Sequence, residues 1–347
     1  MQDEKEKLNN GFPSELRMDM VSKDWVVIAK GRAKRPEAFK NEKAARKEAP
    51  KKNCPFCDLS SQEPPTLIFD NGKKVEFKGE IPKNWTTMTF QNKYPAFVRA
   101  ESLDDRFAGP LYKVMNAAGF HEVVVTRDHK KHLAHFEKEQ TKELFDVYQQ
   151  RFLDMKDERF VNYISIFHNF GSSAGASIAH PHSQIVTTPL IDSDLRGALN
   201  NAKSYLKNKK KCIYCEMNEW EKESKERIVY ENEEFLAVCP FASKTAFEVI
   251  ISPKKHLPYF EKIMEEEKWQ LADIFGAVIK KIYKGLQDPD YNFYLHTAPC
   301  DGESYEYYHW HWTILPKTSI SAGFEIGTRM EISTIEPEKA AEYLRKQ

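Results

Sequence analysis

Two Cys-X-X-Cys pairs, each followed by a lone histidine and then by a His-X-His triplet, constrain this chain more than any other feature. The sets are Cys54, Cys57, His129 and the triplet His180 to His182, and then Cys212, Cys215, His256 and the triplet His309 to His311. The lone histidine precedes the triplet by 51 residues in the first set and by 53 in the second. Three landmarks in one order with a nearly preserved spacing indicate an internal repeat. We therefore expect two similar half-domains, residues 15–195 and residues 210–345.

The repeated cysteines and histidines predict two zinc sites. A Cys-X-X-Cys turn lets two thiolates reach one ion, and two distant histidines complete the tetrahedral S2N2 set that Zn²⁺ favours. The first predicted site consists of Cys54, Cys57, His129 and His180, and the second of Cys212, Cys215, His256 and His309. Ordinary buried cysteines and core histidines are the alternative, which the polar and basic residues flanking both pairs disfavour. Cys239 and Cys300 lack a partner at metal spacing and are expected to be small apolar residues of the core.

Bulk composition excludes several classes of protein. The 52 Lys and Arg residues balance 52 Asp and Glu residues, so no net charge draws the chain to nucleic acid or to an anionic membrane. With 41% hydrophobic and 30% charged residues, the chain is typical of globular proteins. The first ten residues lack the apolar core of a secretory signal, and no apolar run approaches the ~20 residues that span a bilayer. We expect a cytoplasmic protein.

Apolar periodicity predicts a mixed set of strands and helices. Helical spacing of apolar residues predicts amphipathic helices over residues 141–155 and around residues 271–282. Enrichment in β-branched and aromatic residues predicts strands at 25–28, 86–90, 121–126, 163–167, 183–187, 235–238, 247–251, 291–295 and 310–314. The polar stretch 192–211 ends in a run of lysines and is expected to be a solvated linker, with a polyanion-binding patch as the alternative.

His182 is the predicted nucleophile. Side chains two residues apart in a strand point to the same face, so a metal-bound His180 would hold His182 beside it. A neutral imidazole with a pKa of ~6.5 can attack phosphorus at pH 7 without a separate base. The preceding stretch 169–179 is rich in small residues, which lets backbone N–H groups approach phosphate oxygens. Gln184 lies on the same face and could donate to the same oxygens.

The segment 167–184 resembles the active-site segment of the galactose-1-phosphate uridylyltransferases, the transferase branch of the histidine-triad superfamily. The basic segment 32–36 and the segments 323–325 and 337–341 resemble the family's N-terminal and C-terminal motifs. The resemblance runs from about residue 15 to residue 345. It implies an α+β fold in which two histidine-triad-like half-domains join their mostly antiparallel strands into one sheet flanked by helices. Family members are commonly dimers, so a homodimer is expected.

The resemblance also implies a nucleotidyl transfer by double displacement. His182 would attack the α-phosphorus of a nucleoside diphosphate sugar, a sugar 1-phosphate would leave, and a second sugar 1-phosphate would take the nucleotide from the histidine. UDP-glucose and galactose 1-phosphate are the expected substrates. By the same resemblance the substrate contacts are Gln184, Asn169, Gly175 and Ser177 for the phosphates, Arg32 and Arg35 for their charge, Asn92 for the ribose, and Phe324 and Glu325 for the sugar.

Three departures from the family pattern leave the base and the acceptor open. Ser183 stands where many members have glycine, and Lys93 follows Asn92 where the better-known members have an acidic residue. The second metal set has a cysteine pair where some members have a His/carboxylate iron site. These features also resemble the ADP-glucose phosphorylases, so phosphorolysis of ADP-glucose is the alternative. His311 is expected to be a relic, because Thr313 stands where Gln184 would be and no small-residue loop precedes it.

Overall fold

The computed structural model describes residues 14–30, 36–39 and 50–347. Within these residues, eleven strands form one sheet in which all neighbours run antiparallel. In order across the sheet they are β11 (Ile228–Glu231), β12 (Phe235–Val238), β13 (Val249–Pro253), β15 (His311–Pro316), β14 (Tyr291–His296), β9 (Tyr163–Phe170), β10 (His182–Thr188), β8 (His121–Thr126), β5 (Thr87–Gln91), β3 (Leu67–Asp70) and β4 (Lys73–Val75).

The strand order repeats on the two sides of the junction between β9 and β14. On one side the order is β5, β8, β10 and β9, and on the other it is β12, β13, β15 and β14. The two orders meet where β9 and β14 pair, with Asn292 opposite Asn169. The last histidines of the two triplets, His182 and His311, therefore begin corresponding strands, β10 and β15. We keep the division into residues 15–195 and 210–345 as a proposal.

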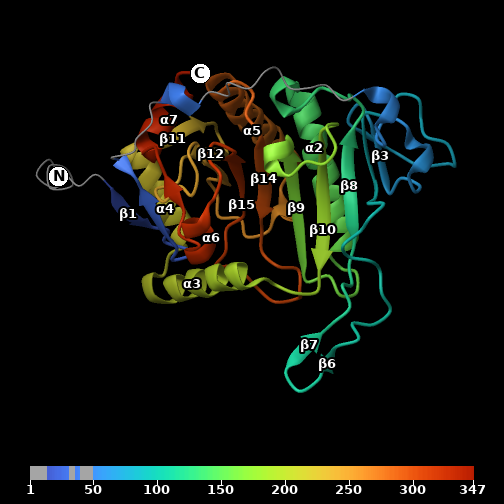
Figure 1. Ribbon diagram of the computed structural model, residues 1–347, viewed down its shortest axis with the longest axis horizontal. Helices are drawn as coiled ribbons and strands as arrows, with labels where there is room; N and C mark the ends of the chain where they lie inside the picture. The colour runs from blue at the N-terminus through green and yellow to red at the C-terminus, as the bar shows by residue number, and fades with distance from the viewer. Residues whose placement is uncertain (1–13, 31–35, 40–49) are drawn as a thin grey trace, which may run out of the picture.

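Two long helices, α2 (Lys138–Met155) and α5 (Glu265–Leu286), pack on one face of the sheet (Figure 1). The residues that repeat at helical spacing in α2 are buried, among them Leu144, Tyr148 and Phe152. Phe145 of α2 and Phe275 of α5 meet edge to face, with ring centroids 5.3 Å apart. This layer of aromatic and aliphatic side chains is the main core. It confirms the expected α+β fold with a large antiparallel sheet flanked by helices.

The polar stretch expected to be a solvated linker is instead a helix, α3 (Ser193–Lys209). The carboxylate of Asp192 accepts hydrogen bonds from the N–H groups of Asp194 and Leu195, which caps the first turn. Leu195, Leu199 and Ala202 recur at helical spacing and are buried. The few apolar residues therefore decided the local structure, and the lysine run lies in and beyond the exposed last turn. The helix α4 (Ile213–Ser224) follows.

A small separate sheet brings both ends of the described chain together. It contains β1 (Glu15–Met18), β2 (Trp25–Ile28) and β16 (Ile332–Ser333), with β16 parallel to β2. The first strands therefore lie against C-terminal residues. The other elements are the helices α6 (Gly323–Thr328) and α7 (Pro337–Arg345) and the hairpin of β6 (Arg106–Ala108) and β7 (Tyr112–Val114), which projects from the body in Figure 1. None of the described helices is long and apolar enough to cross a membrane.

Candidate functional site

The first cysteine pair and its two histidines meet where β8 ends and β10 begins. The sulfur atoms of Cys54 and Cys57 lie 3.5 and 3.6 Å from Nδ1 of His180, and Cys57 lies 3.2 Å from Nδ1 of His129. A tetrahedral Zn²⁺, with bonds of about 2.3 Å to sulfur and about 2.0 Å to nitrogen, separates two such ligands by about 3.5 Å. His180 donates its Nε2–H to the carbonyl of Thr126 over 2.7 Å, which leaves the Nδ1 lone pair facing the sulfurs. The donor set fits a tetrahedral metal ion.

The second cysteine pair repeats this arrangement in the C-terminal half. The sulfur of Cys215 lies 3.4 Å from Nδ1 of His256 and 3.5 Å from Nδ1 of His309. Both rings donate Nε2–H to backbone carbonyls at 2.8 Å, so both Nδ1 lone pairs face the cysteines. With Cys212 included, the four ligand atoms all lie within 4.8 Å of one another, as do those of the first set. The structure thus confirms that each predicted group could hold a metal ion.

His182 starts β10 with its ring oriented by the backbone. Its Nδ1–H donates to the carbonyl of His180 over 2.9 Å, so Nε2 keeps its lone pair. The ring of Phe56, inside the first Cys-X-X-Cys turn, packs 4.9 Å from it. Among the described residues, Nε2 has no hydrogen-bond partner. Burial lowers the pKa of His182 below its usual 6.5, against the opposing effect of the hydrogen bond to His180. The ring is therefore neutral at pH 7 and carries a lone pair at Nε2.

Ser183 joins β10 to the helix α2 through a hydrogen bond on the face of the sheet opposite His182. Its Oγ lies 2.6 Å from the hydroxyl of Tyr148 on α2 and 2.9 Å from Nδ1 of the buried His168 on β9. Alternate residues of a strand face opposite sides, so the contact of Ser183 with α2 turns His182 and Gln184 to the face without these helices. A glycine at this position could make neither contact.

Asn169 is oriented by a residue that sequence reasoning missed. Asn292 donates from Nδ2 to Oδ1 of Asn169 over 2.7 Å and to the carbonyl of Ala174 over 2.8 Å. A carbonyl oxygen can only accept, which identifies the amide nitrogen of Asn292. Asn169 must therefore present its oxygen to Asn292, and its own NH2 group remains for another acceptor. Only the pairing of β9 with β14 brings these two residues together.

The small-residue segment after β9 folds as a short 3-10 turn, η6 (Ser172–Ala174), between two glycines. Gly171 and Gly175 have φ values of 86° and 87°, in the region that favours glycine. A Cβ at Gly175 would meet nothing within 4 Å, so the backbone conformation rather than crowding requires glycine there. Ser177 is exposed in the same loop, five residues before His182. The loop leads to β10, the strand that begins at His182.

Asn92 and Gln184 both contact His121, a residue that had no predicted role. Its Nε2 atom lies 2.8 Å from Oε1 of Gln184 and 3.0 Å from Nδ2 of Asn92. The structure therefore brings the expected ribose contact and one expected phosphate contact together through a third side chain. Arg32 and Arg35 lie outside the described residues.

Phe324 and Glu325 lie far from His182 within one chain. Phe324 is 48% exposed, and Glu325 accepts a hydrogen bond at the start of its own helix, α6. Arg329 at the end of α6 pairs with Asp194 of α3 at 3.7 Å. The helix α3 follows the last residue of β10, whereas His182 is the first, and a strand of seven residues spans about 20 Å. Figure 1 shows α6 beside α3 at that opposite end of the strands.

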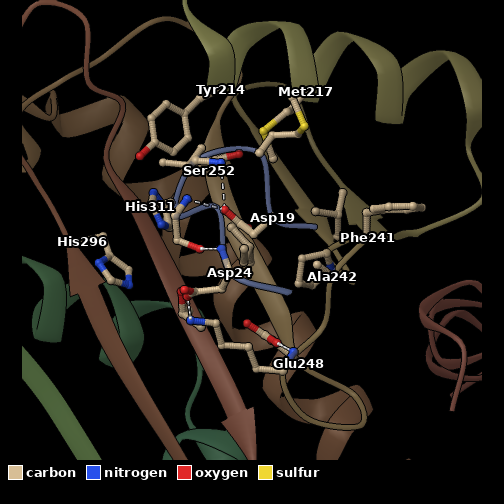
Figure 2. Close-up of a pocket in the computed structure, with 18 of the residues that line it drawn as sticks. Asp19, Asp24, Tyr214, Met217, Phe241, Ala242, Glu248, Ser252, His296 and His311 are labelled. Atoms are coloured by element: carbon tan, nitrogen blue, oxygen red, sulfur yellow. Dashed lines mark hydrogen bonds and ion pairs between the residues drawn. The ribbon is translucent and has the colours of Figure 1, made fainter. Parts of the chain in front are cut away.

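A cavity of about 2260 Å³ opens over the C-terminal half, on the sheet face opposite α2 and α5 (Figure 2). His296 and His311 line it, with ring centroids 4.7 Å apart. Its described lining includes Asn169 and Asn292 at one side but not His182. The cavity therefore reaches His311 of the second His-X-His triplet, whereas the predicted nucleophile is not among its described lining residues.

His311 makes the same backbone hydrogen bond as His182, but different side chains surround its ring. Its Nδ1–H donates to the carbonyl of His309 over 3.1 Å, as His182 does to His180. Asp19, from the turn between β1 and β2, lies beside it in Figure 2, and the carboxyl of Glu248 lines the same cavity. Burial lowers the pKa of His311 to about 4 and raises that of Glu248 to about 7. The carboxylate of Asp19 beside this ring disfavours a phosphate.

The fold and the site together define a class of protein: an α+β sheet protein with a duplicated Cys2His2 group that could hold metal ions. Two family models match the chain. One, described as "Galactose-1-phosphate uridyl transferase, N-terminal domain", covers residues 4–191, and the other, a domain of unknown function, covers residues 112–347. The chain belongs to the galactose-1-phosphate uridylyltransferase family, which confirms the resemblance seen in its motifs.

Individual relatives cover nearly the whole chain. An ADP-glucose phosphorylase from Arabidopsis thaliana is 31% identical over 341 residues, 96% of this chain and 92% of the relative. A galactose-1-phosphate uridylyltransferase from Thermotoga maritima is 29% identical over 342 residues, 96% of this chain and 98% of the relative. A crystal structure of an Arabidopsis thaliana ADP-glucose phosphorylase with bound ADP-glucose matches with a TM-score of 0.79 and 28% identity, over 96% of this chain and 99% of that one.

Proposed function

We propose that this protein is a nucleotidyltransferase that exchanges the uridylyl group between UDP-glucose and galactose 1-phosphate through a covalent intermediate on His182. The observation that carries the proposal is the orientation of His182, whose Nδ1–H is committed to the backbone and whose Nε2 lone pair has no described partner. Relatives named galactose-1-phosphate uridylyltransferase support the substrates.

In the first half-reaction, Nε2 of His182 forms a bond to the α-phosphorus while the bond from that phosphorus to the bridging oxygen breaks. Glucose 1-phosphate leaves with the electron pair of the broken bond, and uridylyl-histidine remains. In the second half-reaction, a phosphate oxygen of galactose 1-phosphate attacks the same phosphorus and Nε2 leaves. In both steps the transition state carries negative charge on phosphate oxygens, so fixed donors and cations supply most of the acceleration.

The proposed phosphate donors are the NH2 groups of Asn169 and Gln184, the backbone at Gly175 and the hydroxyl of Ser177. The geometry supports the first of these most directly, because Asn292 turns the NH2 group of Asn169 away from itself. Arg32 and Arg35 are proposed to neutralise the phosphate charge, and Asn92 to contact the ribose.

We propose that both metal ions are Zn²⁺ with structural roles. Two cysteines and two histidines form the donor set that zinc prefers. Held by Cys54, Cys57, His129 and His180, the first ion would anchor His180 and thereby the carbonyl that orients His182. The thiols at both sites require a reducing environment, which supports a cytoplasmic location.

Phe324 and Glu325 are proposed to reach the sugar from a second copy of the chain. Within one chain, α6 lies beside α3, beyond the end of β10 opposite His182, and β10 is about 20 Å long. A homodimer is therefore part of the proposal. It is supported by the remoteness of α6 within one chain.

Phosphorolysis of ADP-glucose is the second candidate. It is favoured by the Arabidopsis thaliana relative named ADP-glucose phosphorylase, which matches 96% of this chain. The first half-reaction would be the same, with adenine in place of uracil and inorganic phosphate as the final acceptor.

The decisive experiment is to incubate the protein with α-labelled UDP-glucose or ADP-glucose in the absence of an acceptor. We expect an acid-labile, protein-bound nucleotide, formed faster from UDP-glucose, which galactose 1-phosphate discharges. His182→Ala should form none. His311→Ala is the matched control, because it removes the corresponding histidine of the second triplet and should leave labelling intact. Absence of labelling with both nucleotide sugars would refute the mechanism, and faster labelling by ADP-glucose would select the second candidate.

A further inference from the structure

His121 is the first residue of β8, and its imidazole has one unambiguous partner. The backbone N–H of Ala96 donates to Nδ1 of His121 over 3.0 Å. An amide N–H can only donate, so Nδ1 must carry a lone pair. The proton of the neutral ring is therefore on Nε2. This backbone contact from the exposed 92–96 loop decides the tautomer of His121.

The tautomer in turn decides the orientation of Gln184. Nε2 of His121 lies 2.8 Å from Gln184, and the protonated nitrogen requires an acceptor, which is the carboxamide oxygen Oε1. The NH2 group of Gln184 must then point away from His121. Since Gln184 is two residues after His182 in β10, its NH2 group lies on the face of the sheet that carries the nucleophile.

We propose that His121 is a positioning residue that holds Gln184 with its NH2 group toward the α-phosphate. The inference rests on the proposed function and deepens it. Without His121, the carboxamide can rotate by half a turn and present its oxygen to the phosphate, which repels rather than stabilises the developing charge. His121 touches neither the reacting atoms nor the nucleophile and acts only through Gln184.

In the same tautomer, His121 cannot accept a hydrogen bond from Asn92. Nδ2 of Asn92 lies 3.0 Å from Nε2 of His121, but both atoms carry hydrogens, so this contact is not a hydrogen bond in the neutral ring. Oδ1 of Asn92 accepts from the N–H of Tyr94 over 2.9 Å, which keeps its NH2 group on the side of His121. His121 therefore forms a hydrogen bond with Gln184 and only a close contact with Asn92.

Two substitutions of His121 separate the roles of its ring nitrogens. The side-chain amide of glutamine lies about as far from the backbone as Nε2 of histidine, so His121→Gln retains a donor for Gln184. The amide of asparagine lies at the depth of Nδ1, so His121→Asn retains an acceptor for Ala96 and loses the donor. The experiment measures the single-turnover rate of nucleotidyl-enzyme formation, together with binding of UDP-glucose, melting temperature and metal content.

We expect His121→Asn to slow the single turnover about 10- to 100-fold, with substrate affinity and metal content nearly unchanged. His121→Gln should stay within about threefold of the unmodified protein. In a double-mutant cycle, His121→Asn should slow the Gln184→Ala variant no further, because it acts through that residue. Equal rates for the two His121 variants, or additive effects with Gln184→Ala, would overturn the proposal. If the unmodified protein forms no nucleotidyl-enzyme at all, the proposed function fails instead.

A second measurement needs no variant that might fold poorly. Long-range proton–nitrogen NMR correlations of the His121 ring in the full-length protein report which nitrogen is protonated. We expect a proton on Nε2 and a bare Nδ1. A proton on Nδ1 would refute the proposed orientation of Gln184 whatever the activity of the variants.

Discussion

Asn292 offers the sharpest test of the idea that oriented amides prepare this site. Its Nδ2 atom donates two hydrogen bonds, to Oδ1 of Asn169 and to the carbonyl of Ala174, and it belongs to the half of the chain that does not contain His182. Asn292→Ala removes both bonds, each worth about 1 kcal/mol. The expected loss in the free energy of unfolding is about 2 kcal/mol, and the freed amide of Asn169 should slow nucleotidyl-enzyme formation by about tenfold.

Asn292→Asp is the more informative variant, because it has the same shape and opposite hydrogen-bonding character. The new carboxylate can only accept, so Asn169 should turn its NH2 group toward it and present Oδ1 to the phosphate. We expect a loss of about 100- to 1000-fold in the single-turnover rate, larger than for alanine. The assay is rapid quenching with α-labelled UDP-glucose, with urea denaturation measured in parallel.

Asn162→Ala is the matched control for stability. Its Nδ2 atom also donates to a backbone carbonyl, that of Pro189 at 2.8 Å, just before the opposite end of β9. It should cost about 1 kcal/mol and leave the single turnover unchanged. If Asn292→Asp reacts as fast as the unmodified protein, or if Asn162→Ala slows the reaction equally, amide orientation is not what Asn292 contributes.

Three further outcomes are expected. Because burial lowers the pKa of His182, the reactive neutral ring persists to lower pH, so kcat/KM should begin to fall only below pH 6.5; an acid limb above that value would contradict it. Cys54→Ser and Cys212→Ser should each lower the bound metal by about one ion per chain in elemental analysis. Cys54→Ser should slow nucleotidyl transfer more, because only the first site adjoins His182. Equal effects on the rate would argue that the first metal ion does not hold His182 in place. Arg151→Met should lower the free energy of unfolding, measured by urea denaturation, by about 3–5 kcal/mol, because it leaves the buried carboxylate of Glu122 without its partner at 2.8 Å. Adding Glu122→Gln should restore part of that loss. No recovery would show that the ion pair is not the cause.

Much of the fold followed from local patterns. The predicted strand at 121–126 is β8 with the same bounds, and the helix expected at 141–155 is most of α2. The prediction of a solvated linker over residues 192–211 was wrong. Three apolar residues at helical spacing, Leu195, Leu199 and Ala202, stabilise a helix there once a core is available to bury them. Such a contribution depends on tertiary contacts and is weak in the sequence alone.

The metal groups and the placement of His182 beside one of them were readable in advance, because ligand chemistry depends on residue type and a strand places alternate residues on one face. The directions of the amides were not. Gln184 takes its orientation from His121, 63 residues away, and Asn169 from Asn292, 123 residues away. A carboxamide has a donor and an acceptor at nearly the same place, so only the partner that folding brings to it decides which of the two a substrate meets.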